Sequence, residues 1–282
     1  MKGRSSLWII VALGLLHLSP LSLPAQVRVD SLYMPSLGRT MKVSVLLPSE
    51  YDSSWHYPVL YLLHGYGGNS DDWTARTGLP LYVKGMPLIV VMPDAENSWY
   101  VNSYTEPRDR FEDYIVKDVP YYIRRMYSVD TSRQAIAGLS MGGYGALVLA
   151  LRHPSEFHFA GSLSGALSVP RAVNDTSRRP EGALVPSLRK AFGDRPNESR
   201  NDHDVFFLYR EVPRDSFPYL YMAIGIQDAY RRFLPAHRAF TDILRNYGAS
   251  YEYHEVPGGH DWQFWAREIQ PMLKRLREVL KF

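Results

Sequence analysis

One short segment, GLSMGGYGA at residues 138–146, constrains the fold of this chain more than any other. The short and mostly apolar run 133–137 precedes it, and residues 144–152 follow with a helical pattern that stops at His153 and Pro154. A G-x-S-x-G segment between a buried strand and a helix is typical of a sharp turn that presents a serine hydroxyl. Glycines at such a turn leave no Cβ to clash where strand and helix crowd together. The segment therefore predicts that Ser140 is a nucleophile in an α/β chain.

The hydrophobic pattern around this segment predicts the rest of the fold. Residues 27–33 and 40–47 alternate in part and are joined by a turn at 35–38, which predicts an antiparallel hairpin. Compact apolar runs then alternate with helical or polar stretches, as in a mostly parallel central sheet with helices on both faces. These runs are 58–63, 86–92, 133–138, 157–163, 219–226 and 251–256. Helices are expected at 110–127, where Pro120 must kink or interrupt the helix, and at 144–152, 231–247 and 261–280.

Composition narrows the possible chemistry. With 282 residues and 45% hydrophobic content, residues 26–282 are expected to form a single domain around one large core. A formal charge of +3 gives no reason to expect a nucleic-acid partner. The chain has no cysteine, which excludes disulfides, thiolate metal sites and a cysteine nucleophile, so Ser140 remains the strong candidate.

The first 25 residues have the pattern of a secretory signal. Lys2 and Arg4 precede the apolar run 7–18, and a plausible cleavage position follows Ala25. Cleavage would remove two positive charges and no acidic group, so the formal charge would fall from +3 to +1. Export to the periplasm or the medium is expected, with no stable membrane partner after cleavage. The alternative is an uncleaved anchor, although the run is short for a bilayer span.

Residues 166–217 interrupt the alternation of strands and helices. This stretch is rich in proline, arginine, asparagine and aspartate and carries only scattered apolar residues. A segment of this length between strands is usually functional or poorly ordered. We expect a partly helical lid over the site, and the alternative is a passive surface excursion.

A serine nucleophile needs a neutral imidazole as its base and a carboxylate that orients the imidazole. The run 219–226 ends at Gln227-Asp228, and the strand 251–256 is followed by Pro257-Gly258-Gly259-His260. In α/β-hydrolases the acid follows the penultimate strand and the histidine follows the last one. Asp228 and His260 are therefore the predicted acid and base. The competing acids are Asp215, Asp242 and Asp261.

A glycine-rich loop follows the first central strand, with the sequence LLHGYGG at residues 62–68. Such a turn lets backbone N–H groups face an anionic oxygen. The expected oxyanion donors are the N–H groups of Tyr66 and of Met141, the residue after the nucleophile. The alternative is an ordinary glycine turn after a strand.

These motifs together resemble the esterase D-like group of α/β-hydrolases. That group includes feruloyl and acetylxylan esterases of carbohydrate esterase family one, S-formylglutathione hydrolases and mycolyltransferases. The resemblance extends from about Arg39 to the C-terminus and rests on YLLHGYGG, GLSMGGYGA, GIQD and GGHDWQFW, in that order. It implies a catalytic triad of Ser140, Asp228 and His260, oxyanion roles for Tyr66 and Met141, acyl-enzyme chemistry, and no cofactor or metal.

Aromatic residues are expected around the site, and their faces suit sugar rings or a phenolic acyl group. The expected substrate contacts are Trp99, Tyr100 and Trp262, whereas Trp73 and Trp265 are expected mainly to pack in the core. The resemblance favours removal of acetyl or feruloyl groups from plant polysaccharide. The alternatives are a broad-specificity short-chain carboxylesterase, an acyltransferase and a non-catalytic carbohydrate-binding relative. The oligomeric state is left open.

Overall fold

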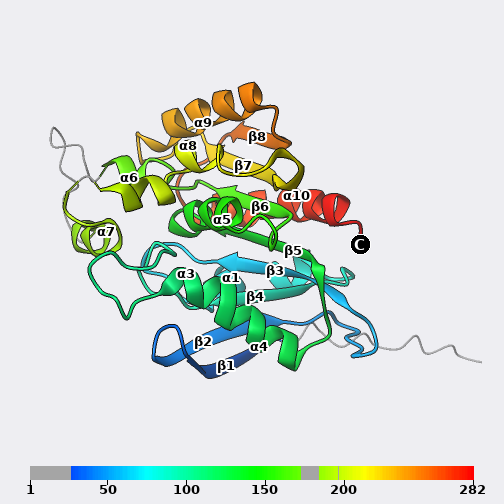
Figure 1. Cartoon of the computed structure of the whole chain (residues 1–282). Coiled ribbons are helices and arrows are strands. Elements are labelled where there is room, and N and C mark those ends of the chain that lie inside the picture. Colours follow the sequence, from blue (N-terminus) through cyan, green and yellow to red (C-terminus); the bar gives the residue numbers. More distant parts are fainter. Residues whose placement is uncertain (1–26, 173–183, 196) are drawn as a thin grey trace, which may run out of the picture.

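A single eight-stranded sheet organises the molecule (Figure 1). The computed structural model describes residues 27–172, 184–195 and 197–282, so the predicted signal peptide lies outside the described residues. The strands lie in the order β1-β2-β4-β3-β5-β6-β7-β8. Their bounds are β1 Val27–Met34, β2 Arg39–Leu46, β3 Tyr57–Leu63, β4 Ile89–Pro93, β5 Val129–Leu139, β6 Phe159–Leu163, β7 Tyr219–Gly225 and β8 Tyr251–Val256. The predicted hairpin is confirmed as β1–β2, and β2 is antiparallel to both neighbours while the other pairs in the sheet are parallel.

Helices cover both faces of this sheet. Their bounds are α1 Asp72–Arg76, α2 Leu79–Tyr82, α3 Phe111–Asp113, the π-helix η1 Tyr114–Asp118, α4 Val119–Met126, α5 Met141–Arg152, α6 Val169–Ala172, α7 Leu184–Phe192, the 3₁₀-helix η2 Glu198–His203, α8 Val205–Leu208, the 3₁₀-helix η3 Arg214–Ser216, α9 Phe233–Tyr247 and α10 Trp262–Leu280. None of the helices formed by residues 27–172, 184–195 and 197–282 has the length and apolar character that crossing a bilayer requires.

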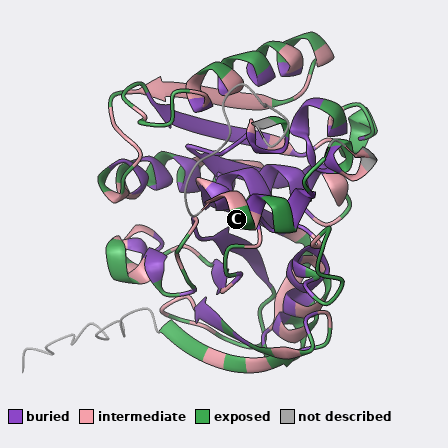
Figure 2. Cartoon of the chain, turned by 90° about the vertical axis from the view of Figure 1, so that its left-hand side faces the viewer, coloured by how far each residue is buried: buried purple, intermediate pink, exposed green. Residues whose placement is uncertain are grey.

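Alternation along the central strands produces two hydrophobic cores. In β3, Tyr61 and Leu63 belong to the core shared with α4, α5 and α9, whereas Leu60 and Leu62 belong to the core shared with α1, α2 and α10. Figure 2 shows that buried residues concentrate in the central strands, while β1 and the outer helices carry the exposed ones. The predicted α/β-hydrolase arrangement is confirmed, and it brings the carboxyl ends of the parallel strands to one edge.

The helix predicted at 110–127 is interrupted just before Pro120, as expected, but it does not end there. The chain forms α3, then the π-helical turn η1, and restarts as α4 with Pro120 in its first turn. A proline is tolerated there because the first N–H groups of a helix have no partner within it. The wider π turn absorbs the interruption, so the helix continues to Met126.

The described parts of the segment 166–217 form short helices. Its later part packs against α5, which covers one face of the parallel strands. Glu112 contacts Arg152 and His153, at the end of α5, and His203, at the end of η2. Burial opposes ionisation of Glu112, but hydrogen bonds from these three groups outweigh it and hold the pKa of its carboxyl well below the usual range. The hydroxyl of Tyr144 in α5 also donates to the backbone oxygen of His203, at 2.7 Å.

Candidate active site

The backbone at Ser140 is bent sharply between β5 and α5. Ser140 has φ 51° and ψ −114°, a conformation that an L-residue adopts only under constraint. A Cβ on Gly138 would lie 2.6 Å from the backbone of Gly142, and a Cβ on Gly142 would lie 2.6 Å from the carbonyl oxygens of Leu63 and His64. Only glycine fits at both positions, so the sequence GLSMG imposes the bend that lifts the serine out of the sheet.

Three side chains from distant loops meet at this bend. The Nε2 atom of His260 lies 2.9 Å from the hydroxyl oxygen of Ser140, and its Nδ1 atom lies 2.8 Å from a carboxylate oxygen of Asp228. The second carboxylate oxygen of Asp228 accepts the backbone N–H of Tyr230 at 2.9 Å. The side chain of Asp228 is only 1% exposed and that of His260 is 10% exposed. The three residues that the sequence singled out therefore lie in one hydrogen-bonded chain.

The three acidic residues that competed with Asp228 as the partner of His260 lie elsewhere and make other contacts. Asp261 caps the start of α10 by accepting the N–H of Phe264 at 2.9 Å. Asp242 forms an exposed ion pair with Arg245 in α9, and Asp215 lies in η3, where it is exposed.

The glycine-rich loop after β3 passes directly beside Ser140. A Cβ on Gly65 would lie 3.6 Å from the Cβ of Ser140 and only 2.5 Å from the side chain of Leu139. The N–H of Gly67 donates to the side chain of Asn97 at 2.6 Å. Tyr66 follows Gly65 in this loop, and its ring packs against Trp99 with centroids 6.1 Å apart.

Buried polar groups hold this loop in place. The Nδ1 atom of His64 lies 2.8 Å from the carbonyl oxygen of Gly65, while its Nε2 atom accepts the N–H of Ala95 at 2.9 Å. Because Nε2 accepts an N–H, the ring proton lies on Nδ1, and burial lowers the pKa of His64. The hydroxyl of Tyr100 donates to the carbonyl oxygen of His64 at 2.8 Å, and the indole of Trp73 donates to that of Leu63 at 3.0 Å.

Ser140 and His260 line a pocket of about 440 Å³. Its aromatic lining is Tyr66, Trp99, Tyr230, Phe233, Trp262 and Trp265. Leu184 of α7 also lines it, so the insertion contributes to the wall. The indole N–H of Trp99 donates to the hydroxyl of Ser187 at 3.1 Å. Because Ser187 also belongs to α7, this bond links the insertion to the pocket wall.

The predicted substrate contacts divide into two groups. Trp99 and Trp262 line the pocket, but Tyr100 does not, because its ring is fully buried beside Gly145 in α5 and its hydroxyl supports the loop after β3. The expectation that Tyr100 contacts substrate does not fit this position. Trp265, expected mainly to pack in the core, is 6% exposed and also lines the pocket.

Sequence reasoning missed Tyr230 and Phe233, two of the three aromatic residues packed against His260. The ring centroids of Tyr230, Phe233 and Trp265 lie 4.6, 5.6 and 5.0 Å from that of His260. Tyr230 lies two positions after Asp228, and this closeness in sequence could have indicated it. Leu184 and Ser187 carried no such signal, because their position over the pocket depends on the path of the insertion.

Comparison with known proteins identifies the family. The “Esterase” family model matches residues 34–276. The chain belongs to this esterase family. Membership makes this protein a carboxylic ester hydrolase. An acetyl esterase from Caldicellulosiruptor saccharolyticus is 32% identical to this esterase over 225 residues, which cover 78% of this chain and 83% of that protein.

Solved structures agree with the fold of this esterase. Fluorophosphonate-binding serine hydrolase F of Staphylococcus aureus has a TM-score of 0.79 at 24% identity and covers 90% of this chain and 98% of its own. A ferulic acid esterase has a TM-score of 0.76 at 23% identity, with 92% and 99% covered. S-formylglutathione hydrolases and mycolyltransferases are also similar to the chain, so the predicted resemblance is confirmed.

Proposed function

We propose that this esterase is a serine hydrolase that acts through an acyl-enzyme on Ser140. His260 takes the hydroxyl proton as the serine oxygen attacks the ester carbonyl, and then gives that proton to the departing alcohol. A water molecule next attacks the acyl-enzyme while His260 again accepts a proton, which returns to Ser140 as the carboxylic acid leaves. Asp228 orients the imidazole and stabilises its cationic form.

The backbone N–H groups of Tyr66 and Met141 are the proposed donors to the oxyanion. Met141 begins α5, so its N–H lies at the positive end of a twelve-residue helix. Tyr66 belongs to the loop that runs beside Ser140 and is held by His64 and Tyr100. One such donor is typically worth about 3 to 4 kcal/mol in the transition state.

The hydrogen-bonded chain from Ser140 through His260 to Asp228 carries this proposal. Purified protein should hydrolyse a panel of 4-nitrophenyl esters, and the Ser140→Ala variant should lose about six orders of magnitude in kcat while folding normally. A fluorophosphonate probe should label Ser140 in the parent and leave the variant unlabelled. Ester hydrolysis that survives in Ser140→Ala would contradict the assignment.

We further propose that the enzyme is exported and removes acetyl or feruloyl groups from plant polysaccharide. The similarity to an acetyl esterase and to a ferulic acid esterase supports this substrate class. The aromatic pocket supports it as well, because aromatic faces suit sugar rings and phenolic groups. Export is inferred from the signal-like residues 1–25.

Kinetics on three substrates test this choice. Acetylated xylan or methyl ferulate should be turned over with a higher kcat/KM than a plain butyrate ester. A preference for butyrate would favour the alternative of a broad short-chain carboxylesterase. Transfer of the acyl group to an added sugar in competition with water would favour an acyltransferase.

A further inference from the structure

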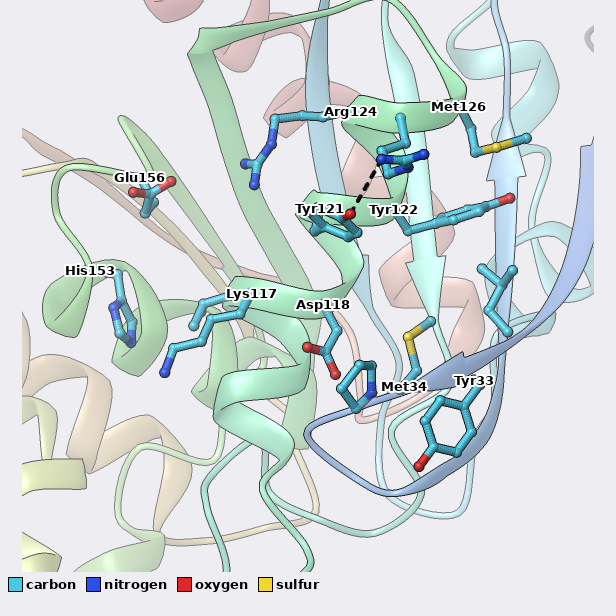
Figure 3. A pocket seen from close by; sticks show the side chains of 14 residues that line it. Tyr33, Met34, Lys117, Asp118, Tyr121, Tyr122, Arg124, Met126, His153 and Glu156 are labelled. Carbon is cyan, nitrogen blue, oxygen red and sulfur yellow. Dashed lines mark hydrogen bonds between the residues drawn. The ribbon is translucent and has the colours of Figure 1, made fainter.

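A second pocket, larger than the first, lies on a different part of the surface (Figure 3). It has a volume of about 760 Å³ and is bounded by the end of β1, by η1 and α4, and by the segment after α5. In Figure 3, Tyr33 and Met34 lie on one side, and His153 and Glu156 lie across from them beyond Tyr121. Because β1 lies four strand positions from β5, the β1 wall is roughly 19 Å from the strand that ends at Ser140.

Two of the tyrosines that line this pocket have exposed rings, and two have hydroxyl groups held by hydrogen bonds. Tyr33 is 67% exposed and Tyr121 is 58% exposed. The hydroxyl of Tyr121 accepts a hydrogen bond from Arg125 at 3.3 Å, and the hydroxyl of Tyr122 donates to Asp30 at 2.8 Å. A ring whose hydroxyl is already hydrogen-bonded, as in Tyr121 and Tyr122, loses less side-chain freedom when it binds a flat partner.

The charges that line the pocket come close to cancelling. Lys117 is paired with a carboxylate outside the lining. This leaves two cations, Arg124 and Arg125, which form no ion pair with any residue that the structure describes, and two carboxylates, Asp118 and Glu156. The lining therefore offers hydrogen-bond donors and acceptors together, with little net charge.

A pyranose chain matches this combination. Its C–H faces are apolar and flat enough to stack on tyrosine rings, and its hydroxyl groups both donate and accept hydrogen bonds. A highly charged polymer would find no excess of the opposite charge. We propose that this pocket, bounded by β1 and α4, is a second binding site for a neutral polysaccharide chain, an inference that rests on the proposed polysaccharide substrate.

Such a site would raise activity on polymers and leave activity on small esters unchanged. A long chain can span the distance from this pocket to Ser140, so binding at the pocket increases the effective concentration of its ester groups at the triad. A 4-nitrophenyl ester is too short to reach both places.

The test uses the double variant Tyr33→Ala/Tyr121→Ala and the control variant Tyr104→Ala, which removes a tyrosine that is 52% exposed and lies outside this pocket. Binding to xylan is measured by affinity electrophoresis, with Ser140→Ala in the background to prevent turnover. We expect about tenfold weaker binding in the double variant and no change in the control.

Binding should persist in about 0.5 M salt, because a neutral ligand is not screened. With Ser140 restored, the double variant should deacetylate xylan more slowly and hydrolyse 4-nitrophenyl acetate within about twofold of the parent.

Failure of the second site and failure of the proposed function would give different results in this test. If the parent deacetylates xylan and the double variant binds and deacetylates it equally well, the second site is overturned and the proposed function stands. If the parent binds xylan through these tyrosines but releases neither acetate nor ferulate from acylated xylan, the proposed substrate fails and the second site stands. Absence of binding by the parent, or binding that is lost in salt, would each overturn the site.

Discussion

His260 Nε2 lies 2.9 Å from Ser140 Oγ, although 120 positions separate the two residues. The loop after β8 provides the imidazole and the bend after β5 provides the hydroxyl. These strands are not neighbours in the sheet, because β6 and β7 lie between them. The contact therefore depends on how far the loops extend over the carboxyl edge of the sheet.

Replacing Asp228 should disable the base and leave the fold intact. The Asp228→Asn change puts an amide where the Nδ1 proton of His260 now has an acceptor, so the wrong tautomer is favoured. We expect kcat on 4-nitrophenyl acetate to fall by about four orders of magnitude. Asp261→Asn is the matched control, because that side chain caps α10 and should affect only stability, by up to about 1 kcal/mol. Activity in Asp228→Asn close to that of the parent would contradict the acid assignment.

Tyr100 should act through the loop that it supports. Tyr100→Phe removes the 2.8 Å hydrogen bond to the carbonyl oxygen of His64, so the loop carrying Tyr66 becomes less well fixed. We expect about a tenfold fall in kcat with little change in KM, because the loss affects the transition state. Tyr61→Phe is the control, since it removes an equally buried hydroxyl that bonds Gln134 instead. Both variants should lose about 1 kcal/mol of unfolding free energy, measured in urea, and only Tyr100→Phe should lose turnover. Equal kcat values in the two variants would show that Tyr100 does not position the loop.

The wall formed by α7 should select substrates by size. Leu184→Trp fills part of the 440 Å³ pocket, so bulky esters should fit less well. We expect kcat/KM for methyl ferulate to fall by about tenfold while that for 4-nitrophenyl acetate stays within about twofold. Equal effects on both esters would indicate that residues 166–217 are a passive surface excursion and not a lid over the site.

Buried His237 should make the fold sensitive to mild acid. Burial lowers the pKa of His237 to about 4, against about 6.5 for an exposed histidine. The unfolded chain therefore binds more protons than the folded one between these values, and stability falls as the pH decreases from about 6.5 to about 4. The shift corresponds to about 3 kcal/mol.

The His237→Phe variant tests this origin. Phenylalanine keeps a planar ring that can pack against Tyr253 but has no proton to gain. Urea unfolding at a series of pH values should show a smaller loss of stability between pH 6.5 and pH 4 in the variant than in the parent. Identical slopes in the two proteins would assign the acid sensitivity to other groups.

The sequence by itself determined the elements and the chemical candidates. The glycines around Ser140 and the apolar runs are local signals, because a bend without room for a Cβ and a buried strand each constrain nearby residues. The order of Ser140, Asp228 and His260 along the chain was enough to propose the triad, since each follows a recognisable strand.

Only the tertiary structure decided which aromatic residues face the pocket beside Ser140. Tyr100 and Trp99 are adjacent in sequence and both have positive φ, yet Tyr100 is buried under the loop after β3 and Trp99 lines the pocket. The position of Leu184 likewise depends on the fold of the insertion. Side-chain direction and long-range packing are properties of the assembled core, and residue type alone does not specify them.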